Sequence, residues 1–318
     1  MSPRHVEIAL HKFLQPFKKE SFLLGVSGGL DSMALFYSFL EMSRKWKMTW
    51  AVAYVHHGSG SPDVVSYRKQ AYEVVKEECD KYGVPFYSNV SDFSNLSKIP
   101  FYGATEAGWR QLRGEFLLSL KKILNADFIV LAHHKEDLLE TRMIRLIRGC
   151  GPQGLTAMYS RQGVVLRPFL SLSRLDLEDY MKTVKGHWIE DPSNDQIDFL
   201  RNWLRHEWLP QLEEKCPGSK AVLANSLQLI ASAMPKNNSL ARCFDSEGRI
   251  LRSELLSLDL EDKKRVFAIY LQRQKVKNYG LSHVNELVKR LDVEQKELTF
   301  KLAQKNWLAN ARHIWCED

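Results

Sequence analysis

The sequence predicts an α/β protein with a parallel sheet, followed by a smaller mixed α/β domain. Apolar, β-rich segments alternate with helical patterns along the first half of the chain, which is typical of a parallel sheet covered on both faces. The strand candidates are residues 21–26, 48–55, 84–90 and 127–132. The helix candidates are approximately residues 31–45, 62–82, 105–124 and 135–148. Ligands of such sheets bind at the carboxyl ends of the strands, so the site is expected there.

A length of 318 residues indicates two domains. We expect a first domain over residues 1–216, a helical linker over 217–238 and a C-terminal domain over 239–318. Within the first domain, a turn-rich break after Arg148 precedes a hairpin around Gly163 and helical segments near residues 173–184 and 199–215. The linker ends at a Pro-Lys-Asn-Asn sequence that is typical of a domain boundary.

A glycine turn between the first strand and the first helix is the most specific local feature. It consists of Ser27, Gly28, Gly29, Leu30, Asp31 and Ser32. Glycines allow backbone N–H groups to approach phosphate oxygens, and the N-terminus of the following helix attracts the same anion. The turn lacks the Gly-Lys-Ser/Thr ending of a Walker A loop and the three glycines of a dinucleotide fingerprint. We interpret it as a polyphosphate site; the alternative is an ordinary capped turn.

Composition limits the possible protein classes. The longest apolar runs have the length of a strand and residues 1–20 mix charged with apolar side chains, so we expect a cytoplasmic protein without a membrane partner. The five cysteines include no CxxC pair, which argues against a disulfide framework or a zinc or iron–sulfur site. Residues 220–318 hold 17 Lys and Arg against 12 Asp and Glu, or +5 of the total net charge of +7. This excess fits a nucleic-acid partner, although many soluble enzymes are equally basic.

A second group of polar residues follows the strand candidate at 127–132. His133, Asp137 and Glu140 are spaced by four and three residues, so they share one helix face if the helix starts as early as residue 133. Such a face could hold Mg²⁺ or a cationic amine. The alternative is a helix N-terminus that carries acidic residues because its dipole favours them.

Arginine stripes occur on three predicted helices. They are Arg110 with Arg113, preceded by Glu106; Arg142, Arg145 and Arg148; and Arg201 with Arg205 and His206. The guanidinium group donates two parallel hydrogen bonds to a phosphate, so each stripe is a candidate phosphate contact. Taken singly, each stripe is explained as readily by a solvated helix face.

Together these segments resemble the tRNA(Ile)-lysidine synthetases, a family of PP-loop ATP pyrophosphatases with an adenine nucleotide alpha hydrolase-like fold. SGGLDS matches the loop of that family, AHHKEDLLET its AHHxxDxxET segment and RLIRGCGPQGL its RxxRGxGxxGL continuation. RPFL, EDPSN and RNWLRHEWLP follow in the same order, and Glu106, Arg110 and Arg113 match an ExxxRxxR stripe. The resemblance covers nearly all of residues 20–210, and the tail is loosely similar to the first C-terminal domain of the family.

The chain departs from the family pattern at several positions. Glu136 stands where Asp is usual, Leu138 where Gln is usual and Gly114 where Tyr is usual. The HxNHxLR segment of the family reads YVHHGSG at residues 54–60, which retains His57. These changes affect any role of Glu136 or of the residues around Ser59.

The resemblance implies an enzyme that uses ATP to adenylate the wobble cytidine of tRNA(Ile) with a CAU anticodon, and then attaches free L-lysine. It implies that Ser27–Ser32 bind ATP, that Asp31 holds Mg²⁺, and that Asp31, Arg113 and His133 are catalytic. Asp137 and Glu140 are then the expected lysine ligands.

Further partners and rival functions follow from the same residues. We expect Arg142, Arg145, Arg201 and Arg205 to contact tRNA, and a homodimer is possible. The alternatives are another PP-loop tRNA-modifying enzyme such as a thiolase, or a catalytically inactive protein that binds nucleotide and RNA.

Overall fold

The computed structural model divides into two compact units, Met1–Thr141 with Met158–Pro217 and Arg142–Ala157 with Gly218–Asp318. It describes residues 4–58, 61–90, 93, 99–100, 102, 105–150, 152–156, 158–190, 199–233, 240, 242–274, 276, 279–291 and 297–317. The expected division placed residues 142–157 in the first domain. The structure groups them with the second unit because η3 (Pro152–Thr156) packs on α9 (Ser219–Ala233), the helix expected as a linker.

The first unit has a six-stranded sheet in the order β3-β2-β1-β4-β6-β5. Its strands are β1 (Ser21–Gly25), β2 (Thr49–Tyr54), β3 (Phe86–Ser88), β4 (Phe128–Val130), β5 (Arg161–Gln162) and β6 (Val165–Leu166). All neighbouring pairs are parallel except β5 with β6. The predicted parallel sheet is therefore confirmed, and the predicted hairpin around Gly163 forms its far edge.

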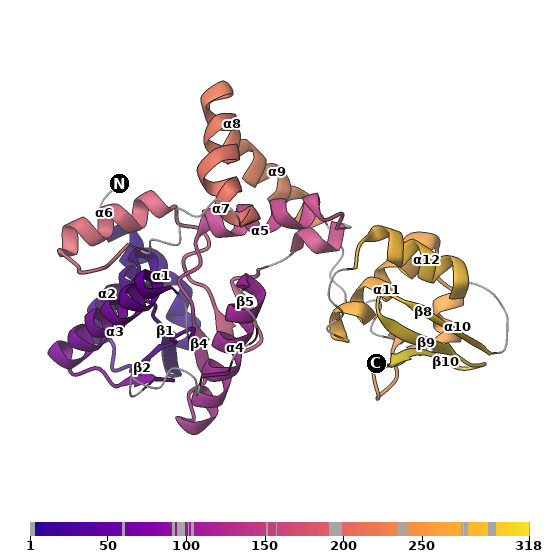
Figure 1. Cartoon of the computed structure of the whole chain (residues 1–318), viewed down its shortest axis with the longest axis horizontal. Coiled ribbons are helices and arrows are strands. Elements are labelled where there is room, and N and C mark those ends of the chain that lie inside the picture. The colour runs from indigo at the N-terminus through magenta and orange to yellow at the C-terminus, as the bar shows by residue number, and fades with distance from the viewer. Residues whose placement is uncertain are drawn as a thin grey trace. The chain divides into compact units, whose positions relative to one another are not determined.

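Helices cover both faces of this sheet (Figure 1). They are α1 (Arg4–Leu14), α2 (Leu30–Lys45), α3 (Pro62–Tyr82), α4 (Glu106–Ile123) and α6 (Arg174–Val184); α5 (Lys135–Ile147) follows β4 in the chain. Successive side chains of a strand point to opposite faces, so Phe22 and Leu24 pack with α1, α2, α3 and α6, whereas Leu23 packs with α4. This double coverage explains why the strands are continuous apolar runs.

The N-terminal helix α1 was not among the expected elements. Val6, Leu10 and Leu14 are fully buried and lie four residues apart, so they form one apolar stripe against α2 and α6. A short 3₁₀ turn, η1 (Gln15–Phe17), then leads to β1. Charged residues lie between these apolar positions, so the stripe is not evident from the composition of residues 1–20.

The expected helix at 199–215 is interrupted by a wider turn. It consists of α7 (Leu200–Trp203), the π-helical segment η5 (Leu204–Trp208) and α8 (Leu209–Lys215). Leu204 and Leu209 are buried, which anchors the middle of this helix to the first unit. Single π-turns inside helices are often found at functional sites.

The second unit contains a separate antiparallel sheet in the order β7-β10-β9-β8. Its elements after α9 are β7 (Ile250–Leu251), α10 (Arg252–Leu256), α11 (Leu260–Arg273), α12 (Leu281–Leu291), β8 (Leu298–Leu302), β9 (Lys305–Ala309) and β10 (His313–Glu317). A core around Trp307 and Tyr270 joins this sheet to α11 and α12. The expected smaller mixed α/β domain is thereby confirmed.

Among the helices of the described residues, none has the length and apolar character that crossing a membrane requires.

Candidate active site

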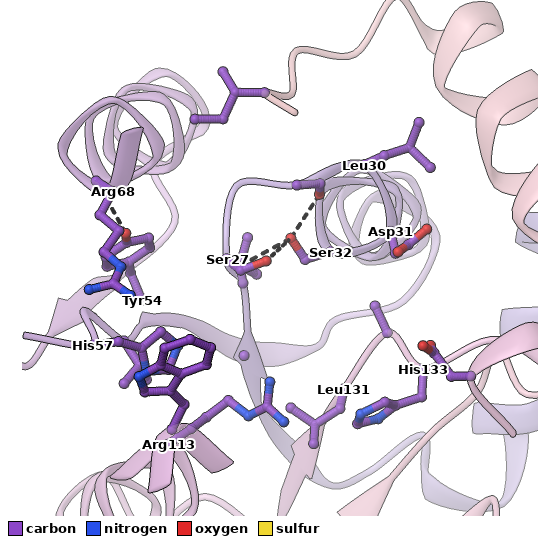
Figure 2. Close-up of a pocket in the computed structure, with 18 of the residues that line it drawn as sticks. Ser27, Leu30, Asp31, Ser32, Tyr54, His57, Arg68, Arg113, Leu131 and His133 are labelled. Atoms are coloured by element: carbon purple, nitrogen blue, oxygen red, sulfur yellow. Dashed lines mark hydrogen bonds between the residues drawn. The ribbon is translucent and has the colours of Figure 1, made fainter. Parts of the chain in front are cut away.

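A cavity of about 330 Å³ opens at the carboxyl ends of the strands of the first unit (Figure 2). The glycine turn after β1, the residues after β2 and the residues after β4 all contribute to its lining. The residues of that lining include Asp31, His57, Arg68, Trp109, Arg113, His133, Asp137, Arg174, Ile189, Glu190 and Arg205. The volume falls at the lower end of the range of small-molecule sites.

The glycine turn is held in shape by its own side chains and by α3. The Ser32 hydroxyl accepts a hydrogen bond from the Ser27 amide at 3.1 Å and donates one to the Gly29 carbonyl at 2.9 Å. Gly28 has a φ of +86°, and a Cβ there would lie 3.0 Å from the Cβ of Ala71. Glycine is required at this position for both reasons. The predicted ATP-binding residues therefore form a preformed turn at the cavity.

Asp31 lies in the first turn of α2 and faces the cavity (Figure 2). Its Oδ1 atom is buried and has no hydrogen-bond partner among the described residues, while Oδ2 lies 3.6 Å from Nε2 of His134. The described residues contain no group of three or more His, Cys, Asp or Glu able to hold a metal. Mg²⁺ in nucleotide sites is usually held by one or two carboxylates together with phosphates, so Asp31 fits that ion.

His134 connects Asp31 to the acidic side chains of α5. Its Nδ1 lies 2.8 Å from Glu136 Oε2, and its Nε2 lies 3.4 Å from Asp137 Oδ2. Burial alone would lower the pKa of His134, but the interactions with Asp31 and Glu136 and the charge of Asp137 raise it to about 10. His134 is therefore a buried cation at neutral pH, a role that the sequence analysis missed.

Glu136 has a structural partner on each side despite being an unusual residue for the family. The same Oε2 that binds His134 also accepts a hydrogen bond from the Arg174 amide at 3.1 Å, at the start of α6. Burial raises the pKa of Glu136, but the hydrogen bond with His134, the charge of His134 and the hydrogen bonds from backbone amides together lower it below its usual value. Glu136 thus holds His134 in place in its ionised form.

Asp137 and Glu140 lie on one face of α5, as their spacing predicts, but they are already paired. Arg205 donates through Nε to Glu140 Oε1 at 2.7 Å and through Nη2 to Glu140 Oε2 at 2.9 Å and to Asp137 Oδ1 at 3.2 Å. Arg201 donates through Nη1 to Glu140 Oε2 at 3.3 Å. The structure therefore places Arg201 and Arg205, expected at tRNA, against the carboxylates expected to bind lysine.

The two carboxyl groups have opposite pKa shifts. Burial raises the pKa of Asp137, but the positive charge of His134, together with the other groups around the carboxylate, lowers it below its usual value. Burial raises the pKa of Glu140, and the hydrogen bonds and charge of Arg205 do not fully offset this effect. Asp137 is therefore the more firmly ionised of the two, and it is also the one that lines the cavity.

His133 lines the cavity one residue before the buried cation but has the opposite electrostatic character. Burial lowers the pKa of His133 to about 3, and although Asp137 acts in the opposite direction, the charges of Arg113, Arg167 and Arg110 lower it further. Its Nδ1 is buried without a hydrogen-bond partner in the described part of the chain. His133 is therefore a neutral imidazole with an available ring nitrogen, and a weaker base than free histidine.

Aromatic and cationic residues that follow β2 or lie on α3 and α4 also line the cavity. The ring centroids of His57 and Trp109 lie 6.1 Å apart, and Cζ of Arg68 lies 5.8 Å from the Trp109 centroid. Burial, followed by the charges of Arg113 and Arg68, lowers the pKa of His57 to about 3. The sequence analysis did not identify Arg68. The available signal was that Gly60 stands where the HxNHxLR segment of the family ends in arginine.

Arg142 and Arg145 bond within the second unit. Arg142 is buried and donates through Nε to the Leu155 carbonyl at 3.0 Å and through Nη2 to Gln228 Oε1 at 2.8 Å. Arg145 donates through Nη1 to the Gly154 carbonyl at 2.8 Å. The guanidinium of Arg142 is thus bonded within the second unit, and the expected contact of Arg142 with tRNA stays a prediction.

Some predicted segments lie partly outside the described residues. Of the EDPSN segment, Glu190 is described and lines the cavity, whereas residues 191–194 are not described. Residues 59 and 60 and the side chain of Glu106 are likewise outside the described part of the chain.

The sheet order, the glycine turn and the cavity at the strand ends define a nucleotide-binding α/β protein. The PP-loop domain family matches residues 3–212, about two thirds of the chain. Among solved structures, the U34-tRNA thiolase of Methanococcus maripaludis has the same fold, with a TM-score of 0.57 and 18% sequence identity over 76% of this chain and 83% of that chain. The class of the protein is therefore a PP-loop protein.

Similarity to curated proteins is more specific. The chain is 38% identical over 306 residues to the tRNA(Ile)-lysidine synthase of Bdellovibrio bacteriovorus, covering 95% of this chain and 93% of that protein. It is 33% identical over 198 residues to the tRNA(Ile)-lysidine synthase of Thermotoga maritima, covering 62% of this chain and 46% of that longer protein. The chain belongs to the tRNA(Ile)-lysidine synthase family.

Proposed function

We propose that the protein uses ATP to join free lysine to C2 of the wobble cytidine of tRNA(Ile), with release of AMP and pyrophosphate. One observation carries the proposal: a single cavity is lined by the glycine turn, by Asp31 and by Asp137. A triphosphate at the turn and an amine at Asp137 would therefore share one site. The fold and the family relationship support the same activity.

The reaction has two steps. In the first, the C2 oxygen of cytidine attacks the α-phosphorus of ATP, an O–P bond forms and pyrophosphate leaves. In the second, the ε-amine of lysine attacks C2, a C–N bond forms, and the C–O bond breaks as AMP leaves with the former carbonyl oxygen. The amine must lose its protons during this step.

The residues of the cavity fit these demands. Arg113 lines the cavity and would stabilise the charge that develops on the α-phosphate. Asp31, with its unpaired Oδ1, would hold Mg²⁺, which supplies a further positive charge to the phosphates when bound.

The second substrate requires groups that hold an amine. Asp137 and Glu140 would bind the lysine ammonium in competition with Arg205, and the unpaired Nδ1 of His133 would accept a hydrogen bond from the amine before attack. The low pKa of His133 suits it to orient the amine as a neutral acceptor.

Mass spectrometry of tRNA(Ile) with a CAU anticodon, incubated with the protein, ATP and lysine, tests the proposal. The expected product gains one lysine and loses one water at the wobble cytidine. Omitting lysine is the control, and the mass increase should then be absent. An unmodified tRNA, or a product in which sulfur replaces oxygen, would contradict the proposal.

Two rival functions have distinguishable results. A thiolase is expected to use cysteine pairs for sulfur delivery or for a cluster. All five cysteines are free, and none lies within five residues of another in the sequence, so the chain has no CxxC pair. A protein that binds nucleotide and RNA without catalysis would not support exchange of labelled pyrophosphate into ATP in the presence of tRNA. Exchange above that of an Asp31→Asn control would exclude this second rival.

The second unit is proposed to hold tRNA, because residues 220–318 carry +5 of the net charge of +7. Lysine and arginine contacts to phosphates release counterions, so binding should weaken steeply with salt. Deleting residues 239–318 should weaken tRNA binding and flatten its salt dependence in filter-binding titrations, while ATP binding is retained. An unchanged salt slope in a folded truncated protein would assign tRNA binding to the residues that remain, with Arg142, Arg145, Arg201 and Arg205 as the next residues to replace.

We further propose a cytoplasmic location and, as a possibility that sedimentation equilibrium can test, a homodimer.

A further inference from the structure

A short segment after α6, residues 186–190, contacts the glycine turn. The Ile189 amide donates a hydrogen bond to the Gly28 carbonyl at 3.1 Å. Because a trans peptide is planar, the Gly28 carbonyl and the Gly29 N–H point in opposite directions. This bond therefore fixes the direction of the Gly29 N–H, which belongs to the turn proposed to bind phosphate.

The same segment is anchored at its other end by a buried hydroxyl group. The His187 amide donates to the Tyr37 hydroxyl at 3.1 Å, and that hydroxyl donates to Glu78 Oε2 at 2.8 Å. Tyr37 and Glu78 are 6% and 5% exposed, so these bonds are shielded from water. One hydroxyl on α2 thus joins α3 to the segment that holds the glycine turn.

Packing around this anchor depends on a second glycine. A Cβ at Gly186 would lie 2.5 Å from Cε of Met181 and 2.7 Å from Cε2 of Tyr37. The Gly186 amide also donates to the Met181 carbonyl at 3.0 Å, which ends α6. The segment therefore leaves α6 directly against the Tyr37 ring, and little freedom remains in its path to Ile189.

We propose that Tyr37 and Glu78 are positioning residues for ATP, which hold the Gly28–Gly29 peptide in its phosphate-binding orientation through residues 186–190. The inference rests on the proposed use of ATP at this turn. Neither side chain lines the cavity, so neither is expected to touch a substrate. Burial, together with the Glu78 carboxylate, raises the pKa of Tyr37, which keeps its hydroxyl a donor at neutral pH.

The test compares two tyrosine-to-phenylalanine substitutions. Tyr37→Phe removes the hydroxyl that joins Glu78 to His187. Tyr180→Phe is the matched control, because Tyr180 is 1% exposed, lies on α6 and has a hydroxyl without a hydrogen-bond partner among the described residues. The readouts are the Kd for ATP measured by calorimetry on the full chain, the KM values for ATP and lysine, and the melting temperature.

Loss of one buried hydrogen bond that orients the turn should raise the Kd for ATP in Tyr37→Phe about fivefold to tenfold. The KM for lysine should change by less than about twofold on the same reasoning, since Asp137 and Glu140 are not part of this network. Tyr180→Phe should bind ATP as the unmodified protein does. Glu78→Gln, whose amide oxygen can still accept from Tyr37, should have a smaller effect than Tyr37→Phe.

Two results would overturn the inference. One is an ATP affinity of a folded Tyr37→Phe protein equal to that of Tyr180→Phe. The other is an equal rise in the KM values for ATP and lysine, which would indicate general loosening. The main readout is ATP binding, so the test does not depend on lysidine formation. If the protein binds ATP but makes no lysidine, the proposed function is refuted, and the comparison of Tyr37→Phe with Tyr180→Phe still tests this inference.

Discussion

The two sides of the cavity contain buried histidines whose pKa values move in opposite directions. The acidic side consists of Asp31 and Asp137, which line the cavity, and of their buried neighbours His134 and Glu140; the basic side consists of His57, Arg68, Trp109 and Arg113. Burial lowers the pKa of both His134 and His57, yet the values are about 10 and about 3. Neighbouring carboxylates outweigh burial on one side, whereas neighbouring arginines add to it on the other.

Under the proposed function, this difference would separate the substrates within one cavity. Phosphates would be attracted to the side with Arg68 and Arg113, and a lysine ammonium would be attracted to the side with Asp137. Mutations on the two sides should therefore have different kinetic effects.

The largest effect is expected at Asp31, where the acidic side meets the glycine turn. Asp31→Asn retains the size of the side chain but removes the charge of the proposed Mg²⁺ ligand, so tRNA-dependent AMP formation should fall on the order of 100-fold or more. Chromatographic measurement of AMP checks this. Asp80→Asn, an exposed position on α3, is the control. Activity close to that of the control would remove Asp31 from the mechanism.

Substitutions of Asp137 and Glu140 test whether the acidic side binds lysine. Asp137→Asn and Glu140→Gln should each raise the KM for lysine roughly tenfold, as expected for the loss of a charged hydrogen bond, and the KM for ATP much less. Steady-state kinetics with each substrate varied in turn measure both values. Glu73→Gln, an exposed position on α3, serves as the control. An equal rise in both KM values would instead assign these carboxylates to the metal site.

The basic side can be tested through the pH dependence of stability. His56 is fully buried next to His57, and burial, followed by Arg68, lowers its pKa to about 4. Between about pH 6.5 and pH 4 the unfolded chain binds a proton at this residue that the folded chain does not, so stability falls as the pH falls through this range.

His56→Asn introduces the residue of the family pattern and removes this titration. When the pH is lowered from 7 to 5, the free energy of unfolding should therefore decrease less in the variant than in the unmodified protein. The expected difference between the two decreases is about 2 kcal/mol. Urea titrations at pH 7, 6 and 5 measure this difference. Parallel pH profiles for the two proteins would show that His56 does not contribute.

The smallest effect is expected at Glu136. Glu136→Gln retains a hydrogen-bond acceptor for His134 but removes one of the charges that raise its pKa, so the KM for lysine should change by about threefold or less, in line with a single partly screened charge. Glu77→Gln, at an exposed position of α3, provides the baseline. A loss as large as that of Asp137→Asn would mean that the charge of His134 is required for lysine binding.

The conformation of the glycine turn and the face shared by the α5 carboxylates could be predicted from the sequence, because both are local features. The turn at Ser27–Ser32 and the face shared by Asp137 and Glu140 depend only on residues a few positions apart. The strand and helix pattern of the first half is confirmed for the same reason, and α3 has the predicted bounds.

The partners of the acidic residues could not be predicted in this way. Arg205 reaches Glu140 across 65 residues, and only the packing of the helix at 200–215 against α5 brings them together. The burial of Arg142 likewise depends on Gln228, 86 residues away. A helical stripe of arginines fixes their shared face but not which element covers that face.

The π-helical segment at Leu204–Trp208 allows the chain length next to the acidic side to vary. A π-turn accommodates about one residue more than an α-turn, so it behaves as an insertion within the helix. Deleting one residue from 206–208 would allow a regular α-helix and would leave Leu209 and the two arginines on nearly their present faces, because the wider turn already absorbs the extra residue. The same deletion within a regular helix such as α5 would rotate all the residues beyond it by about 100°. Homologous chains should therefore differ by one residue in this turn more readily than within α5.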